Sequence, residues 1–156
     1  GLVATYSERY LMSKIFNRLH HVCIVVRDIT AAEAYYESVG VGPWLDYPPL
    51  ADYTELDVPS KDGFVSMKYR YCNTENIQLQ LCQPSPGTPQ ADFLAAHGEG
   101  VFHLGFEVPD ANAAEAQAVD DGVEVWMRGR RTDGSGFTYF KTPEAGVTLE
   151  IRQSQQ

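Results

Sequence analysis

The chain is short of cysteine, and this shortage argues against a fold held together by disulfides. Its three cysteines, Cys23, Cys72 and Cys82, are an odd number, and none has CxxC or CxxCH spacing. Nothing local argues for a bond between Cys72 and Cys82. We therefore expect buried or partly buried free thiols in a reducing compartment, which predicts a cytoplasmic protein.

Positive charge is also scarce. The sequence has 12 lysines and arginines against 21 aspartates and glutamates, which gives a formal net charge of −9. An acidic surface repels nucleic acid and anionic membranes, so we expect neither as a partner. No apolar run approaches the roughly 20 residues that span a bilayer. The first residues also lack the basic and apolar regions of a signal peptide.

Two common catalytic patterns are missing as well, because the sequence holds no Ser-His-Asp arrangement and no glycine loop with phosphate-binding spacing. What it does have is enough hydrophobic residues, 44% of 156, to bury the core of one domain without disulfides. Met12 resembles a natural start. We therefore assign residues 1–11 to an N-terminal extension or remnant and residues 12–153 to a single domain.

An internal repeat is the most informative feature of the sequence. Residues 21–28 (HVCIVVRD) match residues 103–110 (HLGFEVPD), and an Ala-Ala-Glu-Ala and a Gly-Val follow in both copies at the same offset of 82 residues. The ends of the copies, residues 77–83 and 147–153, match at an offset of 70. The first copy therefore carries about twelve additional residues, which we place in the segment 44–61.

Each copy has the pattern of a β-α-β-β-β module, which predicts an α+β fold. The first strands cover residues 21–26 and 103–108, and Thr30 and Asn112 are the expected N-caps of the helices that follow. Further strands are expected at 64–71 and 77–82 in module 1 (about 17–84), and at 123–127, 137–141 and 147–152 in module 2 (about 98–153). The helices should cover one face of the sheet and leave the other free to form a cavity.

Strand alternation directs one histidine and one oxygen-bearing side chain of each module toward that cavity. One face of the first strand is uniformly aliphatic and should pack under the helix: Val22, Ile24 and Val26. His21 therefore points into the cavity and His20 points away from it, and the same parity applies to His103. Gln80 and Glu150 occupy equivalent positions on the last strands, opposite their aliphatic neighbours.

Pseudo-twofold pairing of the modules would bring these four side chains together. Two imidazoles, a carboxylate and an amide oxygen suit one divalent ion such as zinc, cobalt, nickel, manganese or iron(II). We predict a metal site made of His21, Gln80, His103 and Glu150. Four protein ligands on an octahedral ion leave two positions for water or a bidentate substrate. A lone histidine near a strand start is usually structural, so the prediction depends on the pairing.

At these residues the sequence resembles the vicinal oxygen chelate superfamily, which includes glyoxalase I, methylmalonyl-CoA epimerase, extradiol dioxygenases and bleomycin- or fosfomycin-resistance proteins. The resemblance covers about residues 16–153 and is strongest, by motif, to methylmalonyl-CoA epimerase. The motifs are HHVCIVV from His20, CNT from Cys72, QLCQP from Gln80, FHLGFEV from Phe102 and GVTLE from Gly146.

The resemblance implies a mixed sheet curled around the metal, with helices outside and the modules paired within one chain or across a homodimer. It carries the ligand set over to His21, Gln80, His103 and Glu150. The epimerases have a glutamate, thought to be a base, two residues before a glycine, and this chain has Lys61 there, before Gly63. Lys61 and Glu150 are therefore the candidate catalytic residues. A solvated surface lysine is the alternative for Lys61.

Aromatic side chains near the metal would suit a small hydrophobic or aromatic substrate. Trp44, in the additional segment after a Gly-Pro turn, is a candidate for a lid or wall. Tyr53, Tyr69 and Tyr139 are further candidates for substrate binding, with plain core packing as the alternative for those on strands. Four arginines could meet a carboxylate or phosphate: Arg70, Arg128, Arg130 and Arg131.

Three functions are compatible with these residues. The first is a metal-dependent isomerase, epimerase or lyase, in which a base removes the proton next to a carbonyl of a small substrate with vicinal oxygens. The second is a non-haem iron(II) ring-cleaving dioxygenase, because residues 139–143 match part of the extradiol signature that leads to Glu150. The third is a protein that binds a drug or metabolite without chemistry.

Overall fold

A computed structural model describes residues 14–144 and 146–155 and shows an α+β fold, as the repeat predicts. Its strands are β1 (Leu19–Val25), β2 (Leu45–Asp46), β3 (Glu55–Asp57), β4 (Lys68–Asn73), β5 (Gln78–Gln83), β6 (Gly100–Glu107), β7 (Val125–Arg130), β8 (Gly136–Phe140) and β9 (Thr148–Gln153). Its helices are α2 (Ile29–Ser38), α3 (Lys61–Ser66), α4 (Pro89–His97) and α5 (Ala111–Asp120), with a 3-10 turn η1 (Leu50–Asp52). The predicted extension, residues 1–11, lies outside the described residues.

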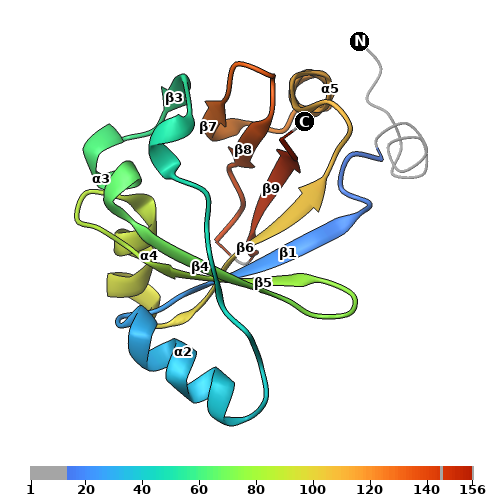
Figure 1. The fold of residues 1–156 in the computed structure, drawn as a ribbon. Helices are drawn as coiled ribbons and strands as arrows, with labels where there is room; N and C mark the ends of the chain where they lie inside the picture. The colour runs from blue at the N-terminus through green and yellow to red at the C-terminus, as the bar shows by residue number, and fades with distance from the viewer. Residues whose placement is uncertain (1–13, 145, 156) are drawn as a thin grey trace.

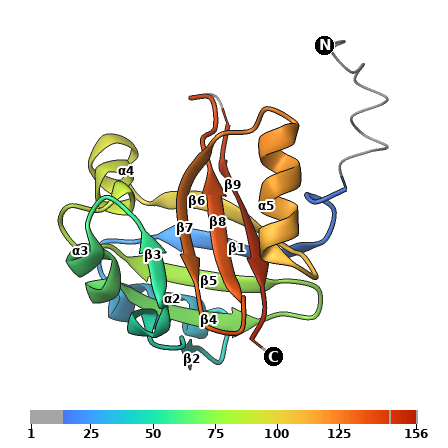
Figure 2. The same cartoon turned by 90° about the horizontal axis from the view of Figure 1, so that it is seen from above.

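All nine strands form one mixed sheet in the order β2-β4-β5-β1-β6-β9-β8-β7-β3. The two copies of the repeat meet in the middle of this sheet, within one chain, because β1 pairs with β6 antiparallel. On either side the pattern is the same: β1 pairs with β5 and β6 pairs with β9, both parallel. In Figure 2, β1, β5 and β4 run horizontally, whereas β7, β8 and β9 run vertically. The homodimer stays a prediction.

The helices α2 and α5 cover the same aliphatic faces that strand alternation predicts. Ile24, Val26 and Leu81 pack with α2 residues in one buried cluster, and Val108 and Ile151 pack with α5 residues in another. A third cluster lies on the other face of the strands and contains Cys23, Val25, Cys82 and Tyr139. Figure 1 shows α2 below β4 and β5, and α5 beside β9. All three cysteines are free and buried, which confirms that prediction.

The helix starts differ from the sequence prediction. The N-caps of α2 and α5 are Asp28 and Asp110, whose side chains accept hydrogen bonds from the backbone N–H of Ala31 and Ala113. Thr30 and Asn112, the predicted caps, follow them. An aspartate is as good a cap as threonine or better, and here it follows the strand by three residues and directly precedes the helix.

Two helices were not predicted. Residues 64–66 were expected to begin a strand, but they belong to α3, which Ser60 caps through a hydrogen bond from the Gly63 N–H. The strand β4 begins only at Lys68. Between the modules, Thr88 caps α4 and Pro89 occupies its first turn. Both helices pack on the third cluster, through Phe64 and Phe93, so they do not lie on the face that α2 and α5 cover.

The additional segment of module 1 reaches both edges of the sheet. β2 pairs with β4 at one edge, and β3 pairs with β7 of module 2 at the other. Residues 47–54 connect the two edge strands, and Figure 1 shows this part of the chain rising past β4 to β3. No helix in the described part of the chain is long and apolar enough to cross a bilayer.

Candidate metal centre and its cavity

His21, His103 and Glu150 converge at one buried point. They come from three neighbouring strands, β1, β6 and β9. His21 Nε2 lies 2.9 Å from His103 Nε2 and 2.9 Å from Glu150 Oε1, and His103 Nε2 lies 3.5 Å from Glu150 Oε2. All three side chains are buried, and one ligand atom from each falls within 4.8 Å of the others.

The register of the central strands explains this convergence. His21 on β1 stands opposite Gly105 on β6, which in turn stands opposite Glu150 on β9. A Cβ atom at Gly105 would lie 2.0 Å from the His21 ring, so only glycine leaves room for the imidazole to cross β6. The ring therefore reaches over a side-chain-free position toward the carboxylate.

A second row of residues repeats this arrangement. His103 on β6 stands opposite Cys23 on β1, and Cys23 stands opposite Gln80 on β5. His21 in one row therefore corresponds to His103 in the other, and Glu150 corresponds to Gln80, in agreement with the repeat offsets of 82 and 70 residues. Gln80 is buried, and its amide Nε2 donates a hydrogen bond to Gln78 Oε1 at 2.8 Å. Its role as a ligand stays a prediction.

Burial determines the protonation of this cluster. It lowers the pKa of His21 to about 3 and that of His103 to about 3, because the interior disfavours an imidazolium. Burial also raises the pKa of Glu150, while its interactions with His103 and Arg152 and a hydrogen bond from Tyr139 act against that rise. Both imidazoles are thus neutral near pH 7 and able to offer a nitrogen lone pair.

The other ring nitrogen of His21 contacts His20, the residue that the alternation of side chains along β1 predicts to point away from the cavity. His20 Nδ1 lies 2.8 Å from His21 Nδ1, and Arg152 Nη1 donates to His20 Nε2 at 2.7 Å. Arg152 also pairs with Glu107 at 3.3 Å. A partner on the second nitrogen fixes the orientation of an imidazole, which is the usual arrangement around metal-binding histidines.

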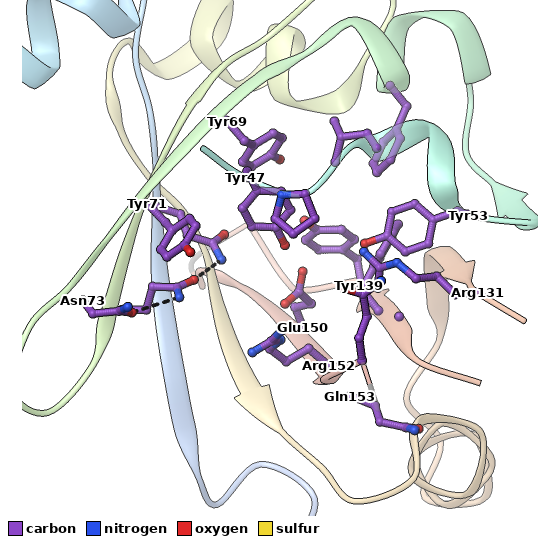
Figure 3. Close-up of a pocket in the computed structure, with 18 residues that line it drawn as sticks. Tyr47, Tyr53, Tyr69, Tyr71, Asn73, Arg131, Tyr139, Glu150, Arg152 and Gln153 are labelled. Atoms are coloured by element: carbon purple, nitrogen blue, oxygen red, sulfur yellow. Dashed lines mark hydrogen bonds between the residues drawn. The ribbon is translucent and has the colours of Figure 1, made fainter. Parts of the chain in front are cut away.

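A cavity of about 230 Å³ opens onto Glu150 and Gln80. Its wall combines strand residues from both modules with the additional segment, and five of the lining side chains are tyrosines: Tyr47, Tyr53, Tyr69, Tyr71 and Tyr139. Figure 3 shows Glu150 near the middle of this group, with Tyr47 and Tyr69 on one side and Tyr53 and Arg131 on another. Burial raises the pKa of Tyr139 well above its usual value, so this hydroxyl is protonated.

The structure brings three of the four predicted aromatic residues to the cavity: Tyr53, Tyr69 and Tyr139. Trp44 is instead buried in the cluster under α2, where its indole N–H donates to the Val41 carbonyl. Lys61 is exposed at the start of α3 and does not line the cavity. The geometry therefore lends no support to a role for Trp44 or Lys61 in the site.

Other residues of the site escaped the sequence interpretation. Gly105 had a visible signal, since it lies two residues after His103 on the same face. Arg152 shares the parity of Glu150 and could have been found in the same way. Tyr47 and Phe137 also line the cavity, and the sequence marks them as candidates only by their aromatic character, Tyr47 in the additional segment and Phe137 on a strand of module 2.

The cluster fits a divalent cation. Two neutral imidazole nitrogens and a carboxylate point at one another in a buried place, and these are donor types that zinc, iron(II), nickel and manganese accept. Without a cation, the Glu150 carboxylate is buried between two neutral rings, and the Arg152 charge that acts on it is already paired with Glu107, so its negative charge is costly. His21, His103 and Glu150 could therefore hold such an ion.

Comparison with known proteins agrees with this architecture. The sequence model of the Glyoxalase/Bleomycin resistance protein/Dioxygenase superfamily matches residues 20–140, which is more than half of the chain. The chain belongs to this superfamily. The match confirms the resemblance to the vicinal oxygen chelate proteins and covers His21 and His103, although Glu150 lies beyond its end.

Within the superfamily, the chain is similar to epimerases of acyl-CoA thioesters. It is 27% identical over 123 residues to an ethylmalonyl-CoA/methylmalonyl-CoA epimerase of Cereibacter sphaeroides, covering 78% of this chain and 83% of that protein. A variant of the Streptomyces coelicolor methylmalonyl-CoA epimerase in complex with 2-nitronate-propionyl-CoA is 25% identical, with a TM-score of 0.66 over 89% of this chain and 95% of the other. The Mycobacterium tuberculosis methylmalonyl-CoA epimerase has a TM-score of 0.67 at 22% identity, covering 91% of each chain, and shares the fold.

Proposed function

We propose that this protein is a divalent-metal-dependent isomerase, epimerase or lyase that removes a proton next to a carbonyl group. The observation that carries the proposal is the convergence of His21, His103 and Glu150 beside a cavity of about 230 Å³ that Glu150 lines. A cation held by these residues would supply Lewis acidity toward a carbonyl oxygen and stabilise the negative charge that develops on it. The similarity to methylmalonyl-CoA epimerases supports the same class of reaction.

Gln80 is the proposed fourth ligand. It is buried, it lines the same cavity as Glu150, and the strand register relates the two positions by the symmetry of the repeat. Its amide oxygen would be the metal-binding atom, since its amide nitrogen donates a hydrogen bond to Gln78. A neutral amide in place of a second carboxylate leaves more positive charge on the ion, which favours binding of an anionic substrate oxygen.

Glu150 is also the proposed proton acceptor. No lysine, histidine or other carboxylate lines the cavity in the described part of the chain, and the remaining titratable groups there are tyrosines and arginines. Burial raises the pKa of Glu150, which favours proton uptake, whereas a cation bound to its carboxylate would act against that rise. The Tyr139 hydroxyl, which hydrogen-bonds Glu150, would hold the carboxylate in place.

We further propose that the sheet curls around this site. Residues 47–54 connect the two edge strands, and such a stretch can span at most roughly 30 Å even when extended. A flat sheet of this many strands would separate its edge strands by roughly 38 Å. In addition, Tyr69 of β4 and Tyr139 of β8 line the same cavity, although four other strands lie between β4 and β8 in the sheet.

The proposal is tested by measuring metal content after changing one histidine. Substitution His103→Ala should remove most of the metal that the purified protein retains after dialysis against nickel(II) or zinc(II), as measured by elemental analysis. His97→Ala is the matched control, because His97 is exposed on α4. Equal metal content in wild type and His103→Ala, with both proteins folded by circular dichroism, would falsify the metal assignment.

A non-haem iron(II) dioxygenase is the second candidate. It is favoured by the absence of a second base among the lining residues and by the Gln80 amide, which is already hydrogen-bonded to Gln78 and would free a position for dioxygen if it did not bind the ion. Anaerobic loading with iron(II), followed by oxygen-uptake assays with catechols, separates the two functions. Catechol-dependent uptake in wild type but not in His103→Ala would favour the dioxygenase.

A further inference from the structure

Arg131 lies in the wall of the cavity, and no ion pair joins it to a carboxylate within residues 14–144 and 146–155. Its guanidinium carbon is 4.3 Å from the centroid of the Tyr53 ring, and its Nε is buried and has no hydrogen-bond partner among the described residues. Its polar contacts are a 3.5 Å approach of Nη1 to the Ser135 hydroxyl and a hydrogen bond with the Tyr53 hydroxyl. In Figure 3 the side chain extends from the chain toward Tyr53 and the cavity.

The other arginines of the sheet are already neutralised. Arg70 pairs with Glu33 of α2, and Arg128 and Arg130 both pair with Glu115 of α5, the equivalent residue of the second copy. Arg152, which also lines the cavity, pairs with Glu107. Among the described residues no ion pair within 4 Å includes Arg131, and Asp133 of the same loop accepts hydrogen bonds from the Ser135 N–H and hydroxyl, so we take the Arg131 charge to be available to a ligand.

The charge inside the cavity is therefore opposite to that of the whole chain. If a divalent ion binds to His21, His103 and Glu150, the positive charges of the ion and of Arg131 would together outweigh the single negative charge of Glu150. The chain as a whole carries −9. A net positive, partly enclosed cavity in an acidic protein concentrates anions, because low-dielectric walls focus the field.

We propose that Arg131 determines substrate specificity by binding an oxyanion of a small acidic substrate, at a place separate from the metal-binding side chains. The inference rests on the proposed function for the identity of the site and adds the class of substrate. A guanidinium presents paired N–H donors that match a carboxylate or a phosphate. The Tyr53 ring covers one flat face of the guanidinium, and the N–H groups that contact neither Ser135 nor the Tyr53 hydroxyl remain for the ligand.

The test uses malonate and inorganic phosphate as probes, with neutral malonamide as the uncharged comparison. Their dissociation constants are measured by titration calorimetry on the full chain, as purified and after addition of nickel(II). Arg131→Gln should weaken malonate binding roughly tenfold to a hundredfold, the usual effect of losing a charge-assisted hydrogen bond. It should leave the affinity for nickel(II) and malonamide unchanged. Arg27→Gln, at an exposed arginine, is the matched control and should bind malonate like wild type.

Unchanged malonate and phosphate affinity in Arg131→Gln would overturn the proposal, as would equal losses of anion and metal affinity, which would indicate a structural role. If Arg131→Gln fails to fold, Tyr53→Leu replaces it and should weaken malonate severalfold at constant nickel(II) affinity. A loss confined to malonate identifies a carboxylic acid as the substrate class, and a loss confined to phosphate identifies a phosphorylated one. Should His103→Ala keep its metal while Arg131→Gln loses the anion, the proposed function fails and the anion site stands.

Discussion

At the scale of single residues, burial prepares His21 and His103 to bind a cation. Each ring sits in the protein interior, where a positive charge on the imidazole would be poorly solvated, and each therefore stays neutral over the whole physiological range. An exposed histidine would begin to protonate near pH 6.5 and would then compete with a metal for its own lone pair. Burial removes that competition.

The same burial predicts how the metal-free protein responds to acid. The unfolded chain binds protons at these histidines below pH 6.5, whereas the native chain binds them only near pH 3, so stability should fall as the pH drops from 6.5 toward 3. The loss is on the order of 1 kcal/mol per pH unit for each imidazole. The raised pKa of Glu150 acts in the opposite direction, since the native chain takes up that proton first.

Urea midpoints at pH 7, 6 and 5 measure this dependence. His103→Gln should show a shallower decline than wild type, and His97→Ala, which keeps both buried rings, should match wild type. A wild-type midpoint that is constant over this range would contradict the assignment of two neutral buried imidazoles.

At this scale the sequence predicts the buried His-His-Glu cluster better than it predicts the wall of the cavity. His21, His103 and Glu150 could be identified because the repeat supplies two copies of each position and strand alternation gives their direction. Lys61 and Trp44 were assigned from their place in the additional segment, which has no counterpart in module 2 to compare with. Their actual positions depend on α3 and on the cluster under α2, which are set by tertiary packing.

At the scale of elements, the register between β1 and β6 is what assembles the centre. Because residue 105 of β6 is a glycine, the His21 ring can cross over β6 and reach Glu150 on β9. The equivalent position in the other row is Cys23, a small residue with a side chain. The two halves of the site are therefore related by symmetry without being identical.

Gly105→Ala should expel the His21 ring, because the new methyl group would lie about where the ring is. We expect a loss of roughly 1–3 kcal/mol in the free energy of unfolding, as for other overpacked interiors, together with loss of nickel(II) binding in titration calorimetry. Gly100→Ala, on the same strand with nothing within 4 Å of its added Cβ, is the control and should leave metal binding intact. Full metal affinity in Gly105→Ala would show that the register is not what positions His21.

Elements with a strong local signal were predictable and the others were not. The strands that carry the predicted ligands have uniform aliphatic faces, and the structure places them within a few residues of the predicted bounds. The helices α3 and α4 are short and begin at Ser60 and Thr88 caps, and no copy in the other module reinforces them. Local alternation in residues 64–71 suggested a strand, but capping and packing on Phe64 favoured a helical turn there.

At the scale of the whole molecule, the residues that could hold an ion come from both modules, so a bound ion would join the two halves of the sheet. An ion that binds only the native state stabilises it, by about 2.7 kcal/mol at a free concentration one hundred times the dissociation constant. We expect nickel(II) or zinc(II) to raise the melting temperature of wild type measured by circular dichroism. The increase should be reversed by a chelator and absent from His103→Gln. An equal increase in that variant would mean that the ion binds elsewhere.

The additional segment that carries Tyr47 and Tyr53 also protects the sheet from its neighbours. Both edge strands of the sheet are very short, with two residues in β2 and three in β3, and each pairs with only part of the longer strand next to it. A foreign strand approaching either end meets an interrupted row of N–H and C=O groups instead of a continuous ladder. Short terminal strands of this kind are a common defence against aggregation. The segment that shapes the cavity wall should therefore also keep the protein from polymerising edge to edge.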